Sequence, residues 1–213
     1  MNSKLVSEFI GTFALVFCGT GAIIINEQTN GQVTHVGISM VFGLIVLAMI
    51  YTFGNSSGAH LNPAVSIGFV FANRFQSKYL IPYIVSQISG AILASLTLHF
   101  LFPDNLKLGA TIPAGSQFQS FILEFILSFI LMLVIIRVSH GSKETGTLAG
   151  IAIGATVGLE ALFAGPISGA SMNPARSLGP ALVSCNLNSI WIYLCAPIMG
   201  ALAAALICKM FKD

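Results

Sequence analysis

The strongest constraint on this chain is a repeated pattern, Ser-Gly-Ala-x-x-Asn-Pro-Ala, which begins at Ser57 and again at Ser168. Each copy follows a long apolar run and precedes a short one, residues 65–72 and 177–184. A helix of about ten residues reaches only about 15 Å, half of the hydrocarbon thickness of a bilayer. In a membrane, each copy must therefore enter as extended chain and return as a half-helix, with its irregular backbone lining a cavity or buried in protein.

Six apolar runs are long enough to cross a membrane, and the polar segments between them are short. These runs cover about residues 5–25, 35–53, 79–102, 118–138, 147–164 and 189–210. The chain is 55% hydrophobic and 8% charged, against about 25% charged residues in a typical soluble domain. The first run is too long for a signal peptide and lacks a clear cleavage site. We therefore expect an all-α membrane protein that forms one domain over residues 1–213.

The basic residues favour one orientation. If the N-terminus is cytoplasmic, seven of the nine Lys and Arg residues lie on the cytoplasmic side, and both termini do as well. These seven are Lys4, Arg74, Lys78, Arg137, Lys143, Lys209 and Lys212. Lys107 and Arg176 are the exceptions. The net charge of +2 is too small to indicate a nucleic-acid partner, and the four cysteines have no metal-type spacing.

The two halves of the chain resemble each other over more than the repeated pattern. Residues 7–13 match residues 123–129, and Gly90 in the third run matches Gly200 in the sixth. Each half, about 1–102 and 118–210, supplies three spans, so the second half enters the membrane from the opposite face. Such an inverted repeat places its functional site near the membrane midplane, at the interrupted segments of the two halves.

Asn62-Pro63-Ala64 and Asn173-Pro174-Ala175 are expected to start the two half-helices, because Asn caps a helix and Pro suits its first position. Two helix N-termini that meet at the midplane place partial positive charge there, and two Asn amides add donors. Cations and protons are opposed at such a point. A single Asn-Pro could be an ordinary turn, but two copies with matching flanks argue against it.

With these motifs the chain resembles the aquaporin (major intrinsic protein) superfamily over nearly its whole length. The resemblance implies two half-helices, a homotetramer with a pore in each subunit, and a place in the plasma (inner) membrane. Residues 164–181 are most similar to the nodulin-like intrinsic proteins and their bacterial relatives, which pass water, glycerol and neutral metalloid acids. No cofactor is implied.

The same resemblance implies a selectivity filter formed by Phe42, Ala161, Ala170 and Arg176. Ala161 falls where water-selective members carry His, and the smaller side chain favours solutes larger than water. Arg176 on the extracytoplasmic side would explain its departure from the charge pattern. Dedicated glycerol channels tend to carry an acidic residue at the position of Ser177 and a basic one at that of Ala181, so a strictly water-selective channel remains an alternative.

Glu8 and Glu124 are intramembrane acids that need partners. They could relay protons, but one Glu per repeat favours acceptance of hydrogen bonds from the backbone of each re-entrant loop. His60 is expected to support the first loop rather than to sense pH. Glu160 could face the vestibule or hydrogen-bond to loop backbone at a subunit interface.

Two other classes of function are less well supported. A coupled secondary transporter also uses inverted repeats and broken helices, but the midplane segments here contain no carboxylate. An intramembrane enzyme would need a nucleophile or metal-ligand arrangement, which the sequence lacks at helical spacing. The sequence thus predicts a passive channel.

Overall fold

The computed structural model describes residues 2–139 and 143–210, and its side-chain description leaves out residues 143–147. Within these ranges all regular structure is helical, which confirms the all-α prediction. The elements are α1 (Asn2–Gln28), α2 (Thr34–Ser57), α3 (Pro63–Phe71), the 3₁₀-helix η1 (Ser77–Tyr79), α4 (Leu80–Leu101), α5 (Gln117–Val138), α6 (Lys143–Ser168), α7 (Pro174–Val183) and α8 (Ile190–Cys208). The side chain of Lys143 and all of Lys212, both used for the predicted orientation, lie outside the described residues.

Six of these helices are long and apolar enough to cross a membrane, as predicted. Two of them run further than the sequence suggested: α2 ends at Ser57 and α6 at Ser168, inside the repeated pattern. Each helix stops at the following glycine. Gly58 and Gly169 both have φ of +88° and donate their N–H to the carbonyl four residues back, at 3.0 Å. Glycine adopts this left-handed conformation without strain, so it ends the helix and starts the loop.

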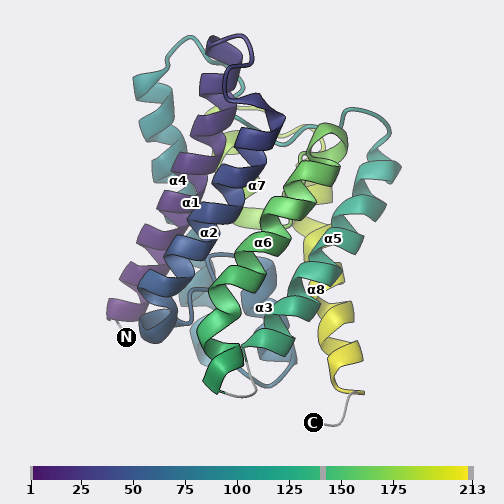
Figure 1. The fold of residues 1–213 in the computed structure, drawn as a ribbon. Coiled ribbons are helices and arrows are strands. Elements are labelled where there is room, and N and C mark those ends of the chain that lie inside the picture. Colours follow the sequence, from purple (N-terminus) through teal and green to yellow (C-terminus); the bar gives the residue numbers. More distant parts are fainter. Residues whose placement is uncertain (1, 140–142, 211–213) are drawn as a thin grey trace.

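The two half-helices lie at opposite ends of the bundle (Figure 1). Helix α3 lies toward the end that carries both chain termini, which we call the terminal end, and α7 lies toward the opposite end. With 9 and 10 residues, neither is long enough to cross a bilayer. The predicted pair of re-entrant half-helices is therefore confirmed.

Each half-helix packs mainly against a long helix from the other half of the chain. Helix α3 has its most extensive contact with α8, and α7 has its most extensive contact with α4. The long helices pair within each half as α1 with α4 and α5 with α8, and α2 contacts α6 across the two halves. The two halves therefore interlock and do not merely lie side by side.

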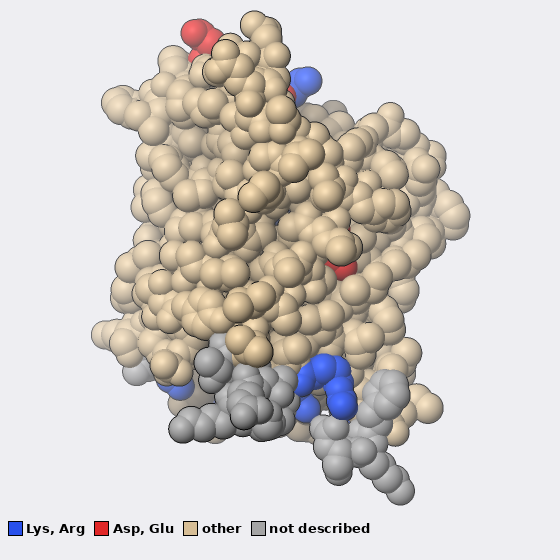
Figure 2. All heavy atoms as spheres, viewed as in Figure 1, with Lys and Arg blue, Asp and Glu red and all other residues tan. Residues whose placement is uncertain are grey.

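Charged residues are confined to the two ends of the molecule on the face in Figure 2, apart from one small acidic spot at mid-height. Most of the Lys and Arg atoms in this view lie at the terminal end, and the wide surface between the ends carries no other charge than this spot. Large apolar side chains are exposed on that surface, among them Met40 at 56% and Leu159 at 67%. An apolar surface of this extent must be covered by lipid or by another protein, and not by water.

The helix crossings within each half depend on glycine. A Cβ atom added at Gly200 would lie 2.3 Å from the carbonyl oxygen of Phe125 and 2.9 Å from the backbone nitrogen of Phe129. We expect Gly200→Ala to lower the free energy of unfolding by about 1–3 kcal/mol, because backbone must move to admit the methyl group. Thermal unfolding in detergent measures this. Gly54→Ala is the control, because its added Cβ meets no atom within 4 Å, and equal melting temperatures for both variants would contradict the expectation.

Candidate functional site

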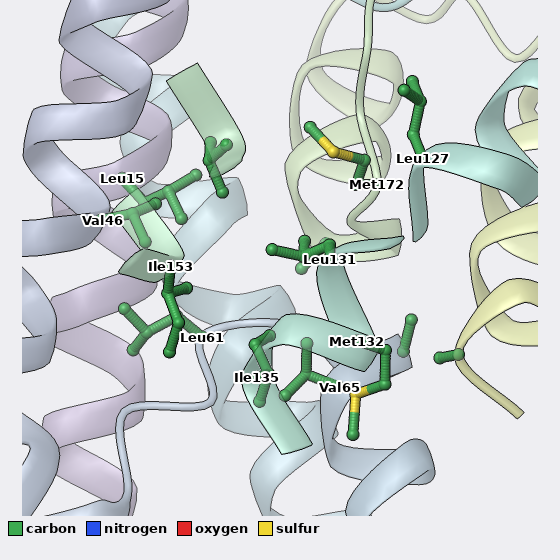
Figure 3. Packing of buried hydrophobic residues seen from close by; sticks show 14 of the residues in the cluster. Leu15, Val46, Leu61, Val65, Leu127, Leu131, Met132, Ile135, Ile153 and Met172 are labelled. Atoms are coloured by element: carbon green, nitrogen blue, oxygen red, sulfur yellow. The ribbon is translucent and has the colours of Figure 1, made fainter. Parts of the chain in front are cut away.

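A cavity of about 690 Å³ runs between the two halves of the bundle. Figure 3 shows Leu15, Val46 and Ile153 on one side of it, across from Leu131 and Ile135 on the other. Toward the terminal end the lining includes Arg74. Toward the opposite end it includes Arg176. The wall is mostly apolar, so the few polar groups that reach the cavity decide what it can bind.

The N-termini of α3 and α7 meet at this cavity through their two capping asparagines. The Oδ1 atom of Asn62 accepts from the N–H of Ala64 at 2.8 Å, and that of Asn173 accepts from the N–H of Ala175 at 3.0 Å. The Nδ2 groups bond across the repeat: Asn62 donates to the carbonyl of Met172 at 2.8 Å. Asn173 donates to the carbonyl of Leu61 at 2.9 Å. An amide NH₂ has two hydrogens, so each Asn keeps one donor for a molecule in the cavity.

The loops that lead into these caps have unusual backbone at matching positions. Ala59 and Leu61 have φ of +47° and +52°, and Ala170 and Met172 have φ of +41° and +54°. All four residues line the cavity. Left-handed backbone costs energy for residues other than glycine and persists only where the surroundings impose it. What imposes it here is a buried carboxylate behind each loop.

Glu8, on α1, is 0% exposed and holds the first loop. Its carboxylate accepts from the N–H of His60 at 2.9 Å and from the N–H of Leu61 at 2.7 Å. It also accepts from the hydroxyl of Ser57 at 2.7 Å and from Nε2 of Gln87 at 2.8 Å. Four donors compensate a charge that would otherwise be very costly to bury.

Glu124, on α5, repeats this pattern on the second loop. It is 0% exposed and accepts from the N–H groups of Ser171 and Met172, both at 2.8 Å. The hydroxyl of Ser168 donates to it at 2.7 Å. Because the same three loop positions donate in each half, the two carboxylates impose the same backbone on both loops.

All four predicted filter residues line the cavity. The exposed fractions of Phe42, Ala161, Ala170 and Arg176 are 9%, 7%, 6% and 2%. The guanidinium carbon of Arg176 lies 5.1 Å from the centre of the Phe42 ring, and its Nη1 donates to the carbonyl of Gly109 at 3.0 Å. Its Nε is buried and has no hydrogen-bond partner among the described residues. The guanidinium has five N–H groups, of which only one, on Nη1, is bonded to the described protein, so it keeps donors for a solute.

His60 lies beside the first loop, with Nδ1 3.1 Å from the hydroxyl of Ser66. Its ring packs among the rings of Phe69, Phe75 and Tyr83, with centroid distances of 4.8, 4.7 and 5.2 Å. This aromatic cluster fixes the imidazole at the wall of the cavity.

Several residues that shape the site were not predicted as site residues from the sequence. Tyr83 and Tyr193 donate to the carbonyls of Ser57 and Ser168, at 2.9 and 2.6 Å, and are buried. Gly109 supplies the carbonyl that holds Arg176, from a loop with no motif. The matching spacing of the two tyrosines in α4 and α8 could have identified them as a repeated pair.

Of the two sequence-based alternatives for Glu160, the vestibule-facing one is wrong, whereas a bond to loop backbone at a subunit interface concerns contacts between subunits and stays a prediction. Its side chain is 2% exposed and does not line the cavity, so it does not face the vestibule. Neither carboxylate oxygen has a hydrogen-bond partner in the described part of the chain, so it does not bond loop backbone there. Ser177, used as an indicator of solute type, is 0% exposed and does not line the cavity either.

A bundle of six spans around one cavity, with two capped half-helices meeting inside it, defines a membrane channel. The profile of the major intrinsic protein family matches residues 1–208. The chain is 48% identical over 203 residues to aquaporin NIP1-1 of Zea mays, covering 95% of this chain and 72% of that protein. It is 46% identical over 203 residues to nodulin-26 of Glycine max, covering 95% and 75%.

Among solved structures, the X-ray structure of the aquaglyceroporin from Plasmodium falciparum is similar, with a TM-score of 0.84 and 29% identity. The match covers 98% of each chain. The chain belongs to the major intrinsic protein family, as its motifs predicted, and members of this family are channels and not enzymes.

The carboxylate behind each loop generates a testable expectation. Glu8→Ala leaves the N–H groups of His60 and Leu61 without their acceptor, at about 1–3 kcal/mol each. Glu8→Gln should also destabilise the loop, because the amide NH₂ of Gln would face one of these two N–H groups, and two donors cannot bond each other. We expect both variants to lose monodisperse folded protein in detergent gel filtration. The control is Glu27→Ala, which removes a single exposed contact with Asn105; loss of folding in that variant too would remove the special role of Glu8.

Proposed function

We propose that this chain is a passive channel for water and small uncharged solutes, such as glycerol and neutral metalloid acids, and that it excludes ions and protons. The observation that carries the proposal is one cavity lined by Asn62, Asn173 and Arg176, each of which has more N–H donors than the described protein uses. The relatives named as aquaporins, and the structural neighbour named as an aquaglyceroporin, support it.

The narrow part of the path is the ring of Phe42, Ala161, Ala170 and Arg176. A solute that enters this ring loses hydration, and the free donors of Arg176 replace part of it. The Phe42 ring offers an apolar wall for the carbon side of a polyol. Two alanines leave room that larger side chains would fill, which supports solutes larger than water.

Ion exclusion rests on two positive regions along the path. Arg176 is buried at the constriction, where its charge is weakly screened. The N-termini of α3 and α7 add partial positive charge at the midplane. Water and glycerol present oxygen atoms to both regions, whereas a cation or a proton is repelled twice.

The placement of the protein in the membrane is part of the same proposal. The basic terminal end in Figure 2 supports cytoplasmic termini, and we assign the channel to the plasma (inner) membrane. Exposed apolar side chains on α2 and α6, such as Met40 and Leu159, support contact with lipid or with neighbouring subunits of a homotetramer. Residues 1–213 form one domain of two inverted repeats, about 1–102 and 118–210, since each half-helix packs on the opposite half.

Glu8, Glu124 and His60 serve as supports of the re-entrant loops in this proposal. The two carboxylates accept hydrogen bonds from loop backbone, and His60 is wedged among aromatic rings at the cavity wall. None of them is required to exchange a proton during permeation.

Reconstitution in liposomes tests the function by stopped-flow light scattering. We expect faster shrinkage in sucrose than in empty vesicles, followed in glycerol by fast reswelling. Ala161→His is the matched variant, because the imidazole should fill the constriction and slow glycerol while water flow persists. Fast water flow without glycerol entry in the unmodified protein would leave a water-selective channel. If neither water flow nor glycerol entry is faster than in empty vesicles, or if solute entry depends on an ion gradient, the proposal is contradicted.

The barrier to protons has its own test. Arg176→Val removes the buried charge but keeps an apolar side chain near the path. Lowering the electrostatic barrier by about 1.4 kcal/mol raises a rate about tenfold, so we expect at least that increase in proton flux. A pH-sensitive dye inside valinomycin-treated liposomes reports it. Proton flux equal to that of the unmodified channel would exclude Arg176 as the barrier.

A further inference from the structure

The loop between α4 and α5, residues 102–116, is attached to α7 at two adjacent points. The carbonyl of Gly109 accepts from Nη1 of Arg176 at 3.0 Å. Two residues further along, the hydroxyl of Thr111 donates to the hydroxyl of Ser177 at 2.8 Å. Because Nε of Arg176 has no partner among the described residues, the position of the guanidinium depends strongly on where this loop holds Gly109.

The second attachment continues inward as a chain of hydroxyl groups. The hydroxyl of Ser171 donates to the carbonyl of Asn173 at 2.9 Å and lies 2.5 Å from the hydroxyl of Ser177. A hydroxyl has one hydrogen to donate. Ser171 has given its hydrogen to Asn173, so Ser177 must donate to Ser171, and Thr111 donates to Ser177. The chain therefore has one direction, from the loop to the residue that caps α7.

The first half of the protein builds this chain differently. Ser66 lies 111 residues before Ser177 and donates to the carbonyl of Asn62 at 3.1 Å. Because its one hydrogen is used there, it accepts from Nδ1 of His60, at the position matching Ser171, at 3.1 Å, and from Nε2 of Gln87, on α4, at 3.0 Å. In the second half, Pro197 on α8 stands where the tyrosine spacing places the match of Gln87, and a proline side chain donates nothing. A loop residue, Thr111, therefore takes the place of a helix residue.

The loop is itself held firmly enough to act as an anchor. Leu108 is 1% exposed and packs with Ile24 and Leu98. The N–H of Ala114 donates to the carbonyl of Ile167 at 2.9 Å. Thr111 is 7% exposed. A hydrogen bond between two packed segments can fix a neighbouring group to within fractions of an ångström, which is what a selective constriction needs.

We propose that Thr111 is a positioning residue for the outer constriction. Its hydroxyl, acting through Ser177, keeps the 109–111 segment in register with α7, and so fixes the place of the Arg176 guanidinium opposite Phe42. The same chain holds the carbonyl side of Asn173. Thr111 thereby tunes the ratio of glycerol to water permeability without touching the solute; this inference rests on the proposed function.

Three variants separate positioning from simple packing. Thr111→Val keeps the shape but removes the hydroxyl, Thr111→Ser keeps the hydroxyl, and Ser177→Ala removes its acceptor. We expect Thr111→Val to change the ratio of glycerol to water permeability by about two- to tenfold, the factor that corresponds to one lost hydrogen bond. Thr111→Ser should restore the ratio of the unmodified protein. The double variant Thr111→Val with Ser177→Ala should match the single ones, because both break one chain.

The control is Thr97→Val, which makes the same chemical change where the hydroxyl donates to the carbonyl of Leu93 in its own helix, at 2.8 Å. Permeabilities are compared at equal amounts of folded protein, so partial misfolding does not alter the ratio. If Thr111→Val does not fold, the ratio of glycerol to water permeability is measured in Ser177→Ala instead, because that variant breaks the same hydrogen bond. An unchanged ratio in the folded variants, or an equal change in Thr111→Ser, would overturn the proposal. An unmodified protein that conducts neither solute would instead overturn the proposed function.

Discussion

The structure depends on the meeting of two helix N-termini inside the bundle. Neither α3 nor α7 can cross a membrane, so each leaves irregular backbone at a depth where water cannot satisfy it. Asn62 and Asn173 resolve this together, because each caps its own helix and donates to a carbonyl of the opposite loop. Each half therefore requires the other, and the packing of α3 on α8 and of α7 on α4 follows from that exchange.

Two buried carboxylates make this meeting point reproducible. Glu8 and Glu124 each accept from three matching positions of a loop, and strained left-handed backbone is the result. An acid inside a membrane protein is commonly a sign of proton or ion movement. Here all the donors around each carboxylate are structural, so burial and hydrogen bonding account for the two acids.

The two halves share the same backbone arrangement, but several side chains at matching positions of the cavity wall differ between them. The position that matches Arg176 in the first half is Val65, and the position that matches Ala161 is Ile50; both line the cavity as well. One end of the path therefore has a buried cation and small side chains, and the matching place at the other end is apolar. The proposed selectivity filter therefore lies where the repeat is broken.

The sequence by itself determined the spans, the half-helix starts at Asn62 and Asn173, and the pairing of one Glu with each loop. These follow from length, capping and burial of charge, which act within a few residues or through the repeat. Only the tertiary structure decided the loop carbonyl at Gly109, the hydroxyl chain from Thr111, and the burial of Glu160 without a hydrogen-bond partner in the described part of the chain. Their partners, or lack of them, depend on packing between segments distant in sequence, where no local pattern sets which atoms meet.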